Sequence, residues 1–370
     1  MSVAPERAAA PAVVPAPAVV PAPAVVPAPS APAEPAASLP SGAAEPWHAR
    51  VVRAALPLWA GGEAATARLL CLSENATYRV DLPDGRRTVL RVNRPGYHSH
   101  AALVSEVAWV RALRAQDVVR TADVVPTASG DDVATVDLPG EGVRHAVMSE
   151  WVDGREPSGA DLAADYAQVG GLTARMHRHA RTWSRPAGFT RFTWTLADMI
   201  GDSARWGRWQ DGPGVGPAET ALLRPAAALV TRRVEGFGTD ASRFGLIHAD
   251  MRPANLLVGD DGAVHVIDFD DCGFGWYAFD LAAALSFLEA DPAAPSLAEA
   301  WLSGYTREAP LEPEALAMIP TFVMLRRLML LAWVGSHAET EMAASVADGY
   351  ADGTARLAQR YLASAGNAVW

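Results

Sequence analysis

One segment in the second half of the chain constrains both fold and chemistry more than any other. Residues 246–271 read LIHADMRPANLLVGDDGAVHVIDFDD. His248, Asp250 and Asn255 form the pattern H-x-D-x-x-x-x-N, and Asp268 belongs to the acidic run at the end. Two apolar stretches flank a Gly-Asp-Asp-Gly linker, which is typical of a β-hairpin. A hairpin reverses the chain, so Asn255 and Asp268 are predicted to lie close together.

These side chains, in this order, suit the transfer of a phosphoryl group from a nucleotide. The reaction needs a group that positions or deprotonates the attacking hydroxyl, and oxygen ligands that hold Mg²⁺ on the phosphates. Asp250 is predicted to accept the hydroxyl proton, and Asn255 and Asp268 to ligate the metal. The alternative is an ordinary hairpin flanked by solvated acids. The complete ordered set, joined by a hairpin of this length, favours catalysis.

The same residues resemble the catalytic segment of the aminoglycoside phosphotransferase and choline kinase group, relatives of the protein kinases. Arg252 and Pro253 stand where the protein-kinase loop has Lys and Pro. Ala249 replaces its Arg, as is usual in the small-molecule kinases of the family. Residues 271–282, DCGFGWYAFDLA, are similar to the family's D-x-G-x-G…D-L-A stretch. The resemblance implies that Asp280 caps the next helix and braces the catalytic loop.

The resemblance also implies an α+β, bilobal protein-kinase-like fold. It covers residues 47–365 as an architecture, with specific motifs only in 246–282. The small N-terminal lobe is expected to be β-rich with one helix. The larger helical C-terminal lobe is expected to carry the catalytic hairpin. His248 and Arg252 are expected to serve the catalytic loop beside Asp250.

Composition is consistent with a folded enzyme. A chain of 370 residues with 50% hydrophobic content is long enough for a sizeable core and for two lobes or domains. The net charge of −11 disfavours wrapping of a nucleic acid backbone. Only Cys71 and Cys272 are present, which argues against a disulfide framework and fits a reducing cytoplasm. Cys272 is predicted to be a small buried hydrophobe.

Residues 1–45 differ in kind from the rest. Residues 11–29 read PAVVPAPAVVPAPAVVPAP, and proline at this density excludes helix and interior strand. The segment is predicted to be a polyproline-like, solvated tail. It lacks the basic start and unbroken apolar run of a secretory signal. Inert low complexity is the favoured interpretation, and a spacer or partner-binding tail is the alternative.

No stretch is predicted to span a membrane. The most apolar candidate, residues 322–334, is interrupted by Arg326 and Arg327 and is short for a span. It is predicted to be a buried helix of the second lobe whose arginines pair with acids. The family resemblance implies that these arginines face the catalytic loop.

Periodicity divides the folded part into residues 46–152 and 153–370. Alternating apolar runs bounded by turn residues predict strands at 68–72, 77–82, 88–93, 133–138 and 145–152, and helical spacing predicts a helix at 100–115. Beyond these, helices are predicted at 161–180, 217–235, 279–290, 295–306, 312–335 and 338–365, with hairpin strands at 256–258 and 263–269.

The N-terminal lobe is predicted to bind the nucleotide. A kinase needs a cation on the phosphates and a carboxylate that holds this cation. Arg91 lies in a predicted strand and Glu106 on the following helix. The two resemble the family's Lys–Glu pair, with Arg in place of Lys, and arginine also pairs bidentately with carboxylate or phosphate. The alternative is a surface arginine and a solvated glutamate.

The loop at 72–78 is predicted to cover the phosphates. It lacks the Gly-rich pattern of protein kinases. Ser73, Asn75 and Thr77 offer hydroxyl, amide and backbone N–H groups to a phosphate instead. An ordinary turn is the alternative interpretation.

The interlobe hinge is predicted at 148–154, MSEWVDG. By resemblance, backbone groups near Glu150 and Val152 bind the adenine edge, and Met148 lines the adenine pocket. A plain core position is equally open for Met148.

Four tryptophans follow the first helix of the large lobe, where insertions in relatives shape the acceptor pocket: Trp183, Trp194, Trp206 and Trp209. Aromatic rings there stack on a sugar or cage a quaternary amine, but packing between helices is the favoured interpretation. Asp198 and Asp202 either meet a cationic acceptor or are solvated. His177 and His179 have no neighbouring ligands in the sequence and are interpreted as core or surface histidines.

The sequence predicts an enzyme that moves the ATP γ-phosphoryl group, with Mg²⁺, to a hydroxyl of a small molecule such as an aminoglycoside, an amino alcohol or homoserine. The second hypothesis is a bacterial stress-response-type Ser/Thr protein kinase of the same family. The short stretch 271–280 weighs against it, because no long activation segment fits there. The third is a nucleotide-binding module without catalysis. No nucleic acid or membrane partner is expected, Asp270 either assists a second metal ion or is solvated, and the oligomeric state stays open.

Overall fold

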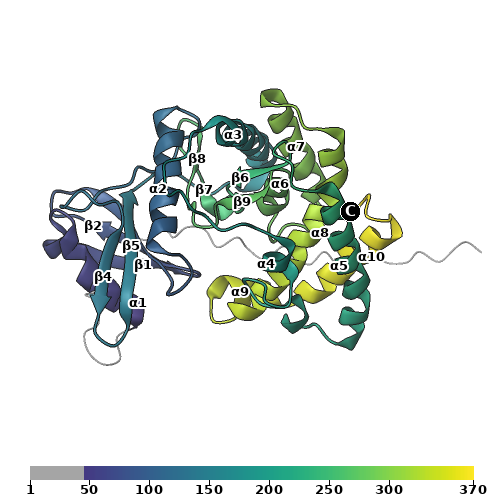
Figure 1. Cartoon of the computed structure of the whole chain (residues 1–370), viewed down its shortest axis with the longest axis horizontal. Coiled ribbons are helices and arrows are strands. Elements are labelled where there is room, and N and C mark those ends of the chain that lie inside the picture. The colour runs from purple at the N-terminus through teal and green to yellow at the C-terminus, as the bar shows by residue number, and fades with distance from the viewer. Residues whose placement is uncertain (1–45) are drawn as a thin grey trace, which may run out of the picture.

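The computed structural model describes residues 46–370, and the predicted proline-rich tail at 1–45 lies outside the described residues. The chain forms two lobes, a smaller one dominated by strands and a larger one dominated by helices (Figure 1). The predicted bilobal α+β architecture is confirmed. The change from strand to helix occurs between Glu150 and Leu162, close to the predicted boundary at 152.

The N-lobe is built on an antiparallel sheet of five strands in the order β1-β2-β3-β5-β4. Its elements are β1 (Thr66–Leu72), β2 (Ala76–Asp81), β3 (Arg87–Val92), helix α2 (His100–Ala115), β4 (Ala134–Leu138) and β5 (Gly142–Glu150). Each corresponds to a predicted element. Alternation explains the central strands, since Tyr78, Val80, Leu90 and Val92 are buried and the residues between them are half-buried.

A helix that the periodicity did not predict precedes this sheet. Helix α1 (Trp47–Ala55) buries Val51, Val52 and Ala55 in the N-lobe core, together with residues of β2 and β3. The prediction of a single helix in this lobe is therefore wrong. The helix is short and Pro57 lies two residues beyond its end, so its apolar period is too brief to stand out.

The C-lobe consists of helices around two small sheets. The helices are α3 (Leu162–Thr182), α4 (Leu196–Ile200), α5 (Pro217–Phe237), α6 (Phe279–Ala284), α7 (Ala294–Glu308), α8 (Pro313–Ser336), α9 (Glu341–Ala347) and α10 (Tyr350–Ala363). Strand β6 (Phe244–Ile247) pairs with β9 (Gly273–Trp276), and β7 (Leu256–Val258) pairs with β8 (Val264–Val266). Short 3₁₀ helices lie at Leu56–Leu58, Gly62–Ala64, Gly159–Asp161, Trp209–Asp211 and Pro253–Asn255.

Two helical predictions need correction in the C-lobe, and some short elements were not predicted. Helix α6 ends at Ala284 rather than at 290, and Phe287 shortly after it has a positive φ of 68°. The helix predicted at 338–365 is two helices, because Gly349 takes a left-handed φ of 70° between α9 and α10. Helix α4 and the sheet of β6 and β9 were not predicted, since elements of four or five residues show little period.

Helices α3 and α7 pack closely through glycine. A Cβ on Gly170 would lie 1.9 Å from the carbonyl oxygen of Trp301, and a Cβ on Gly304 would lie 1.8 Å from that of Ala167. Any larger side chain at either position would push the two helices apart. This packing fixes α3, which carries His177 toward the catalytic segment.

Helix α8 has the length and composition of a membrane span, with a mean hydropathy of 1.7. It is the one such helix among residues 46–370, and 83% of its most apolar window is buried inside the protein. Its bounds match the helix predicted at 312–335, and its burial matches the predicted core helix. Arg326 and Arg327 are also buried, and both pair with acids as predicted.

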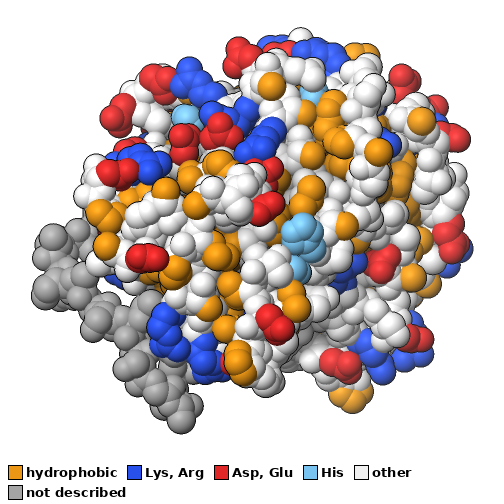
Figure 2. Space-filling view, turned by 60° about the vertical axis from the view of Figure 1, so that its left-hand side comes forward, with side chains coloured by type: hydrophobic (Ala, Val, Ile, Leu, Met, Phe, Trp, Pro, Cys, Tyr) orange, Lys and Arg blue, Asp and Glu red, His pale blue; other side chains and the backbone are white. Residues whose placement is uncertain are grey.

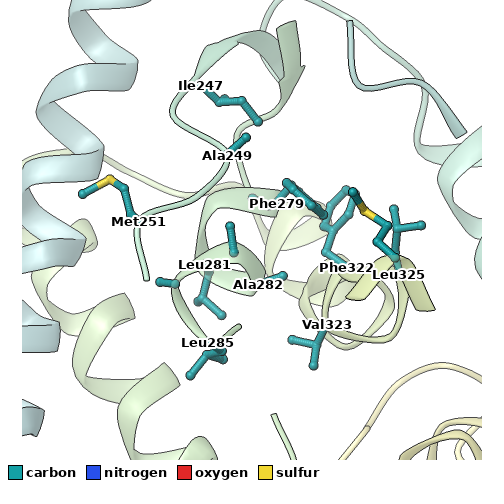
Figure 3. Close-up of a cluster of buried hydrophobic side chains, with 14 of the residues drawn as sticks. Ile247, Ala249, Met251, Phe279, Leu281, Ala282, Leu285, Phe322, Val323 and Leu325 are labelled. Atoms are coloured by element: carbon teal, nitrogen blue, oxygen red, sulfur yellow. The ribbon is translucent and has the colours of Figure 1, made fainter. Parts of the chain in front are cut away.

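The C-lobe core lies directly beneath the catalytic segment. Figure 3 shows Ile247 and Ala249 beside the side chains of α6 and α8, whereas Met251 points away from them. The sulfur of Met251 lies 3.4 Å from Oγ1 of Thr173 on α3. Ile247, Ala249 and Met251 are fully buried and anchor this stretch in the core. His248 is buried as well, whereas Asp250 and Arg252 are half-buried.

The surface carries both signs of charge. On the face shown in Figure 2, acidic and arginine side chains lie interspersed among hydrophobic ones. This face has no continuous basic stripe of the kind that follows a phosphate backbone.

Candidate active site

The catalytic loop is held in a strained conformation by a buried carboxylate. Ala249 has a φ of 66°, which is unusual for a residue with a side chain. Asp280 accepts hydrogen bonds from the backbone N–H groups of Ala249 (2.7 Å) and His248 (3.3 Å), and lies 2.9 Å from Nε2 of His177. Asp280 therefore braces the loop as predicted. It does not cap α6, because its oxygens serve the loop and His177.

The hairpin brings Asn255 and Asp268 together as predicted. The N–H of Ile267 donates to the carbonyl of Asn255 at 3.0 Å, so the two ends of the hairpin lie side by side. The turn between β7 and β8 uses Gly262 at a φ of 76°, which glycine adopts without strain. Strand β8 stops at Val266 rather than 269, because Asp268 leaves the extended conformation with a φ of 56°.

Asp250 sits at the centre of a polar cluster. Its carboxylate accepts hydrogen bonds from Nδ2 of Asn255 (2.6 Å), Nε of Arg252 (3.2 Å) and Nη2 of Arg326 (2.5 Å). Burial alone would raise the pKa of Asp250, but the cations of Arg252 and Arg326 keep that pKa below its usual value. Asp250 is therefore ionised at neutral pH and able to accept a hydrogen bond from a hydroxyl.

His248 supports this arrangement from the core side. It is fully buried, lies beside Phe269 with ring centroids 4.6 Å apart, and accepts the N–H of Asp250 at Nδ1 (3.3 Å). Burial lowers the pKa of His248, so the ring is neutral. This contact agrees with the expectation that His248 serves the catalytic loop beside Asp250.

Asp268 has the properties of a metal ligand. Its side chain is 46% exposed, and its ion-pair partner in the structure is Arg91, at 3.2 Å from Nη1 to Oδ1. Desolvation, together with the neighbouring carboxylates Asp270 and Glu106, raises the pKa of Asp268 to about 6, even though Arg91 opposes the shift. A carboxylate with surplus negative charge around it is suited to a divalent cation.

Asn255 fits the same role. Its amide nitrogen donates to both the carboxylate and the carbonyl oxygen of Asp250, which leaves the amide oxygen for a ligand bond. Among residues 46–370 no group of three or more His, Cys, Asp or Glu is arranged to hold a metal ion. One carboxylate and one amide oxygen still suit Mg²⁺, which keeps several waters and phosphate oxygens as ligands.

Metal-dependent nucleotide binding should weaken in acid. A carboxyl with a pKa near 6 is ionised above that pH and protonated below it, and protonation competes with the metal. Between pH 7.5 and pH 5 the Mg²⁺-dependent part of the affinity for a non-hydrolysable ATP analogue should fall about tenfold. Calorimetric titration with Mg²⁺ and with EDTA at both values measures this part. The Asp268→Asn variant, in which nothing titrates at this position, is the control; equal pH dependence in both proteins would contradict the assignment.

Arg91 and Glu106 form the predicted ion pair. The distance from Nη2 of Arg91 to Oε1 of Glu106 is 2.6 Å, and both side chains are largely buried. The same guanidinium reaches Asp268, and lies 3.6 Å from Asp270. Arg91 thus connects Glu106 on helix α2 to Asp268 at the end of the hairpin.

Asp270 is not solvated. It is buried, accepts a hydrogen bond from Nδ2 of Asn75 (2.8 Å) and lies 3.2 Å from Nε2 of His98. Burial would raise the pKa of Asp270, but Arg91 and His98 lower it well below its usual value. These contacts give Asp270 a structural role between the lobes, and the solvated alternative is wrong.

The loop at 72–78, which is predicted to cover the phosphates, is anchored through the side chain of Asn75. The side-chain oxygen of Asn75 accepts from the N–H of Arg94 (3.1 Å), while its nitrogen is bonded to Asp270. Both ends of its amide are therefore engaged inside the protein. Ser73 and Thr77 are half-buried on either side, with the Ser73 N–H donating to the Asn75 carbonyl (2.9 Å).

The hinge residues differ in their environments. Met148 is fully buried and packs in the N-lobe core. The N–H of Glu150 donates to the carbonyl of Asp123 at 2.8 Å, so this donor is occupied. The N–H of Trp151 donates to the carbonyl of Arg87 (3.3 Å), which is the last backbone hydrogen bond of the hinge. Val152 is the next residue. Val152 is thus the better placed of the two for an adenine edge.

The tryptophans mainly pack. Trp194, Trp206 and Trp209 are buried in the C-lobe core and Trp183 packs against it, as the favoured interpretation predicted. Asp198 forms a capping box with Thr195 at the start of α4, and Asp202 is exposed. His177 is buried against Asp280 and Tyr305, and His179 accepts from Trp109 at 3.4 Å, which makes both core histidines.

Sequence reasoning missed three residues at this site. Arg191 is buried and donates to the carbonyls of Cys272 and Ala102. Asp271 is 9% exposed and accepts a hydrogen bond from Tyr97 (2.8 Å). The third acid in the D-F-D-D run was a signal for Asp271, whereas no local pattern marks Arg191 or Tyr97.

Comparison with known proteins places these features in a family. The model of a family described as "Phosphotransferase enzyme family" matches residues 72–317. The amicoumacin kinase of Bacillus subtilis (strain 168) is 24% identical over 275 residues, which cover 71% of this chain and 78% of that protein.

Two solved structures are similar over most of their length. A microcompartment-associated aminopropanol kinase is 45% identical with a TM-score of 0.79, over 87% of this chain and 99% of that chain. An amicoumacin kinase in complex with AMP-PNP and Ca²⁺ is 20% identical with a TM-score of 0.66, over 83% of this chain and 91% of that chain. The latter is a likeness of fold.

Proposed function

Because the chain belongs to the phosphotransferase enzyme family, we propose that it transfers the ATP γ-phosphoryl group, with Mg²⁺, to the hydroxyl of a small amino alcohol. The family match confirms the predicted phosphotransferase, and the aminopropanol kinase at 45% identity supports the acceptor class. The residues described above supply each part of the reaction.

In this proposal Asp250 accepts a hydrogen bond from the acceptor hydroxyl and orients its oxygen for attack. Asn255 and Asp268 hold the metal, which neutralises charge on the phosphate oxygens. Arg91, held by Glu106 at 2.6 Å, is the cation nearest to Asp268 and contacts the phosphates. Backbone groups of the loop at 73–77 and of Val152 contact the rest of the nucleotide.

One observation carries the choice of a cationic acceptor. Asp271 is buried, and its side chain is bonded to the neutral hydroxyl of Tyr97. No ion pair joins it to an Arg or His in the described part of the chain, whereas Asp268, Asp270 and Asp250 all have such partners. Burial and the nearby carboxylates of Asp250, Glu74 and Asp270 raise the pKa of Asp271 well above its usual value. An ammonium group would relieve this repulsion.

The test compares an amino alcohol with its uncharged counterpart. We expect 1-amino-2-propanol to be phosphorylated with a much lower KM than 1,2-propanediol. Asp271→Asn should raise the KM for the amino alcohol by roughly 10- to 100-fold, the range of a hydrogen bond to a charged group, and should leave the KM for the diol nearly unchanged. Asp202→Asn, at an exposed acid, is the matched control.

Other outcomes lead to other conclusions. Equal KM values for both acceptors in the native protein would remove the cationic acceptor. Label from ATP appearing on protein rather than on a metabolite would favour the protein kinase hypothesis. Nucleotide binding without ADP release, across a panel of hydroxyl metabolites, would favour the non-catalytic module.

A further inference from the structure

We propose that Arg191 is a positioning residue that holds helix α2 and the loop of residues 268–272 in one catalytic arrangement. The proposal rests on the proposed function in so far as Asp268 is taken as a metal ligand. Arg191 itself contacts neither Asp268 nor Asp250. It acts through Glu106 and through the backbone of the loop that follows Asp268.

The guanidinium of Arg191 joins the two lobes. Its side chain is fully buried. Nη1 donates to the carbonyl of Ala102 on α2 (3.0 Å), Nε donates to the carbonyl of Cys272 (2.6 Å), and Nη2 donates to the carbonyl of Asp270. Three backbone oxygens, one in the N-lobe helix and two in the loop after Asp268, are thus held by one planar cation.

The same cation completes a charge network. Glu106 lies between two arginines, 2.6 Å from Arg91 and 3.5 Å from Arg191. Arg91 also faces Asp268 and Asp270. Without Arg191, a single arginine would face three carboxylates. The guanidinium of Arg91 would then divide its contacts differently among these three carboxylates, and its distance to Asp268 would no longer be fixed.

The segment of residues 190–194, which we call the strap, is held by contacts on both sides of Arg191. On one side the N–H of Thr190 donates to the hydroxyl of Ser105 on α2 (2.9 Å), and the ring of Phe192 stacks on His98 with centroids 5.4 Å apart. On the other side the N–H of Phe274 donates to the carbonyl of Phe192 (3.0 Å), and the N–H of Trp194 to the carbonyl of Phe274 (2.7 Å). The segment is fastened to β9 and reaches over α2.

This strap explains how the loop keeps its strained backbone. Asp268 has a φ of 56°, a conformation that costs free energy in a non-glycine residue and persists only where the surroundings enforce it. Arg191 fixes the carbonyl oxygens two and four residues further on. Loss of these bonds would let the loop relax and move the Asp268 carboxylate away from Asn255.

The test separates metal-dependent from metal-independent nucleotide binding. Arg191→Met should reduce the gain in AMP-PNP affinity that Mg²⁺ produces by roughly tenfold or more, and lower kcat by a similar factor. Affinity measured in EDTA should fall by a smaller factor than the Mg²⁺-dependent gain does, since the adenine contacts are untouched. Arg191→Lys should be intermediate, because it keeps the charge and loses the fork. Arg178→Met, at an exposed arginine on α3 that contacts Glu308, is the matched control.

Two measurements keep the outcome clear. Thermal melting on the same samples shows whether a loss exceeds the unfolded fraction. If Arg191→Met does not fold, Ser105→Ala, which removes one anchor of the strap, should show a smaller shift in the same direction. A native Mg²⁺-dependent gain in Arg191→Met, or in both Arg191→Lys and Ser105→Ala, overturns the proposal. The absence of any such gain in the native protein would instead overturn the proposed function.

Discussion

Replacing Asp268 with alanine is expected to reduce turnover by about 10³-fold or more. Asp268 is the one carboxylate among the two residues assigned to the metal. Stabilisation of transition-state charge by a metal ion is worth several kcal/mol, and losing it lowers the rate by roughly 10³-fold. ADP release at saturating nucleotide and acceptor, with Mg²⁺ varied, measures the effect. Asp260→Ala, at an exposed acid in the turn of the same hairpin, should retain native turnover.

The stability of this variant adds a second criterion. Since the surroundings of Asp268 disfavour its charge, removing the charge should not destabilise the metal-free protein at neutral pH. Alanine tolerates the φ of 56° less well than asparagine does. Asp268→Asn is therefore the cleaner variant for melting experiments. Metal-dependent turnover near the native level in either variant would remove Asp268 from the mechanism.

Replacing Asp250 with asparagine is expected to lower the rate of phosphoryl transfer by roughly 10²–10⁴-fold, the usual contribution of a positioned general base. The amide preserves size but cannot take the hydroxyl proton. Nucleotide affinity should remain nearly native, because Asp250 contacts Arg252, Arg326 and Asn255 rather than the hinge. ADP release, nucleotide affinity and melting temperature should be measured on one sample.

This substitution also tests the role of the surrounding cations. Arg326 is buried at 2.5 Å from Asp250, so the loss of its charged partner should lower the melting temperature to some extent. Asp261→Asn, in an exposed pair with Arg120 at 2.5 Å, is the matched control for loss of an Asp–Arg contact. A fall in turnover that unfolding fully explains would make Asp250 a structural residue.

The parts of the site that lie close in sequence could be predicted from it. Asp250, Asn255 and Asp268 are carried by one loop and one hairpin, so their order and spacing nearly determine their geometry. Arg91 and Glu106 could be predicted because a strand and the following helix carry them at positions that resemble the family's Lys–Glu pair. The pairing of Arg326 with an acid was anticipated for a simpler reason, that a buried cation requires a partner.

The parts assembled from distant segments could not be predicted. Arg191 contacts residues on α2 and on the loop after Asp268, and no local spacing connects these three places. The side chain of Asn75 was expected to face a phosphate, but Asp270 takes its amide nitrogen, a contact between lobes that periodicity cannot reveal. The small sheet of β6 and β9 was missed because Gly273 and Gly275 interrupt the apolar pattern of its second strand.

The arginine at position 91 has a practical consequence for studying this protein. Probes that report on nucleotide sites of kinases by acylating an amine require a lysine beside the phosphates, and the guanidinium of Arg91 does not react in this way. No other side chain substitutes for it, because all 31 basic residues of the 370-residue sequence, histidine aside, are arginines. Chemoproteomic surveys based on lysine labelling would therefore pass over this enzyme even when its nucleotide site is fully active.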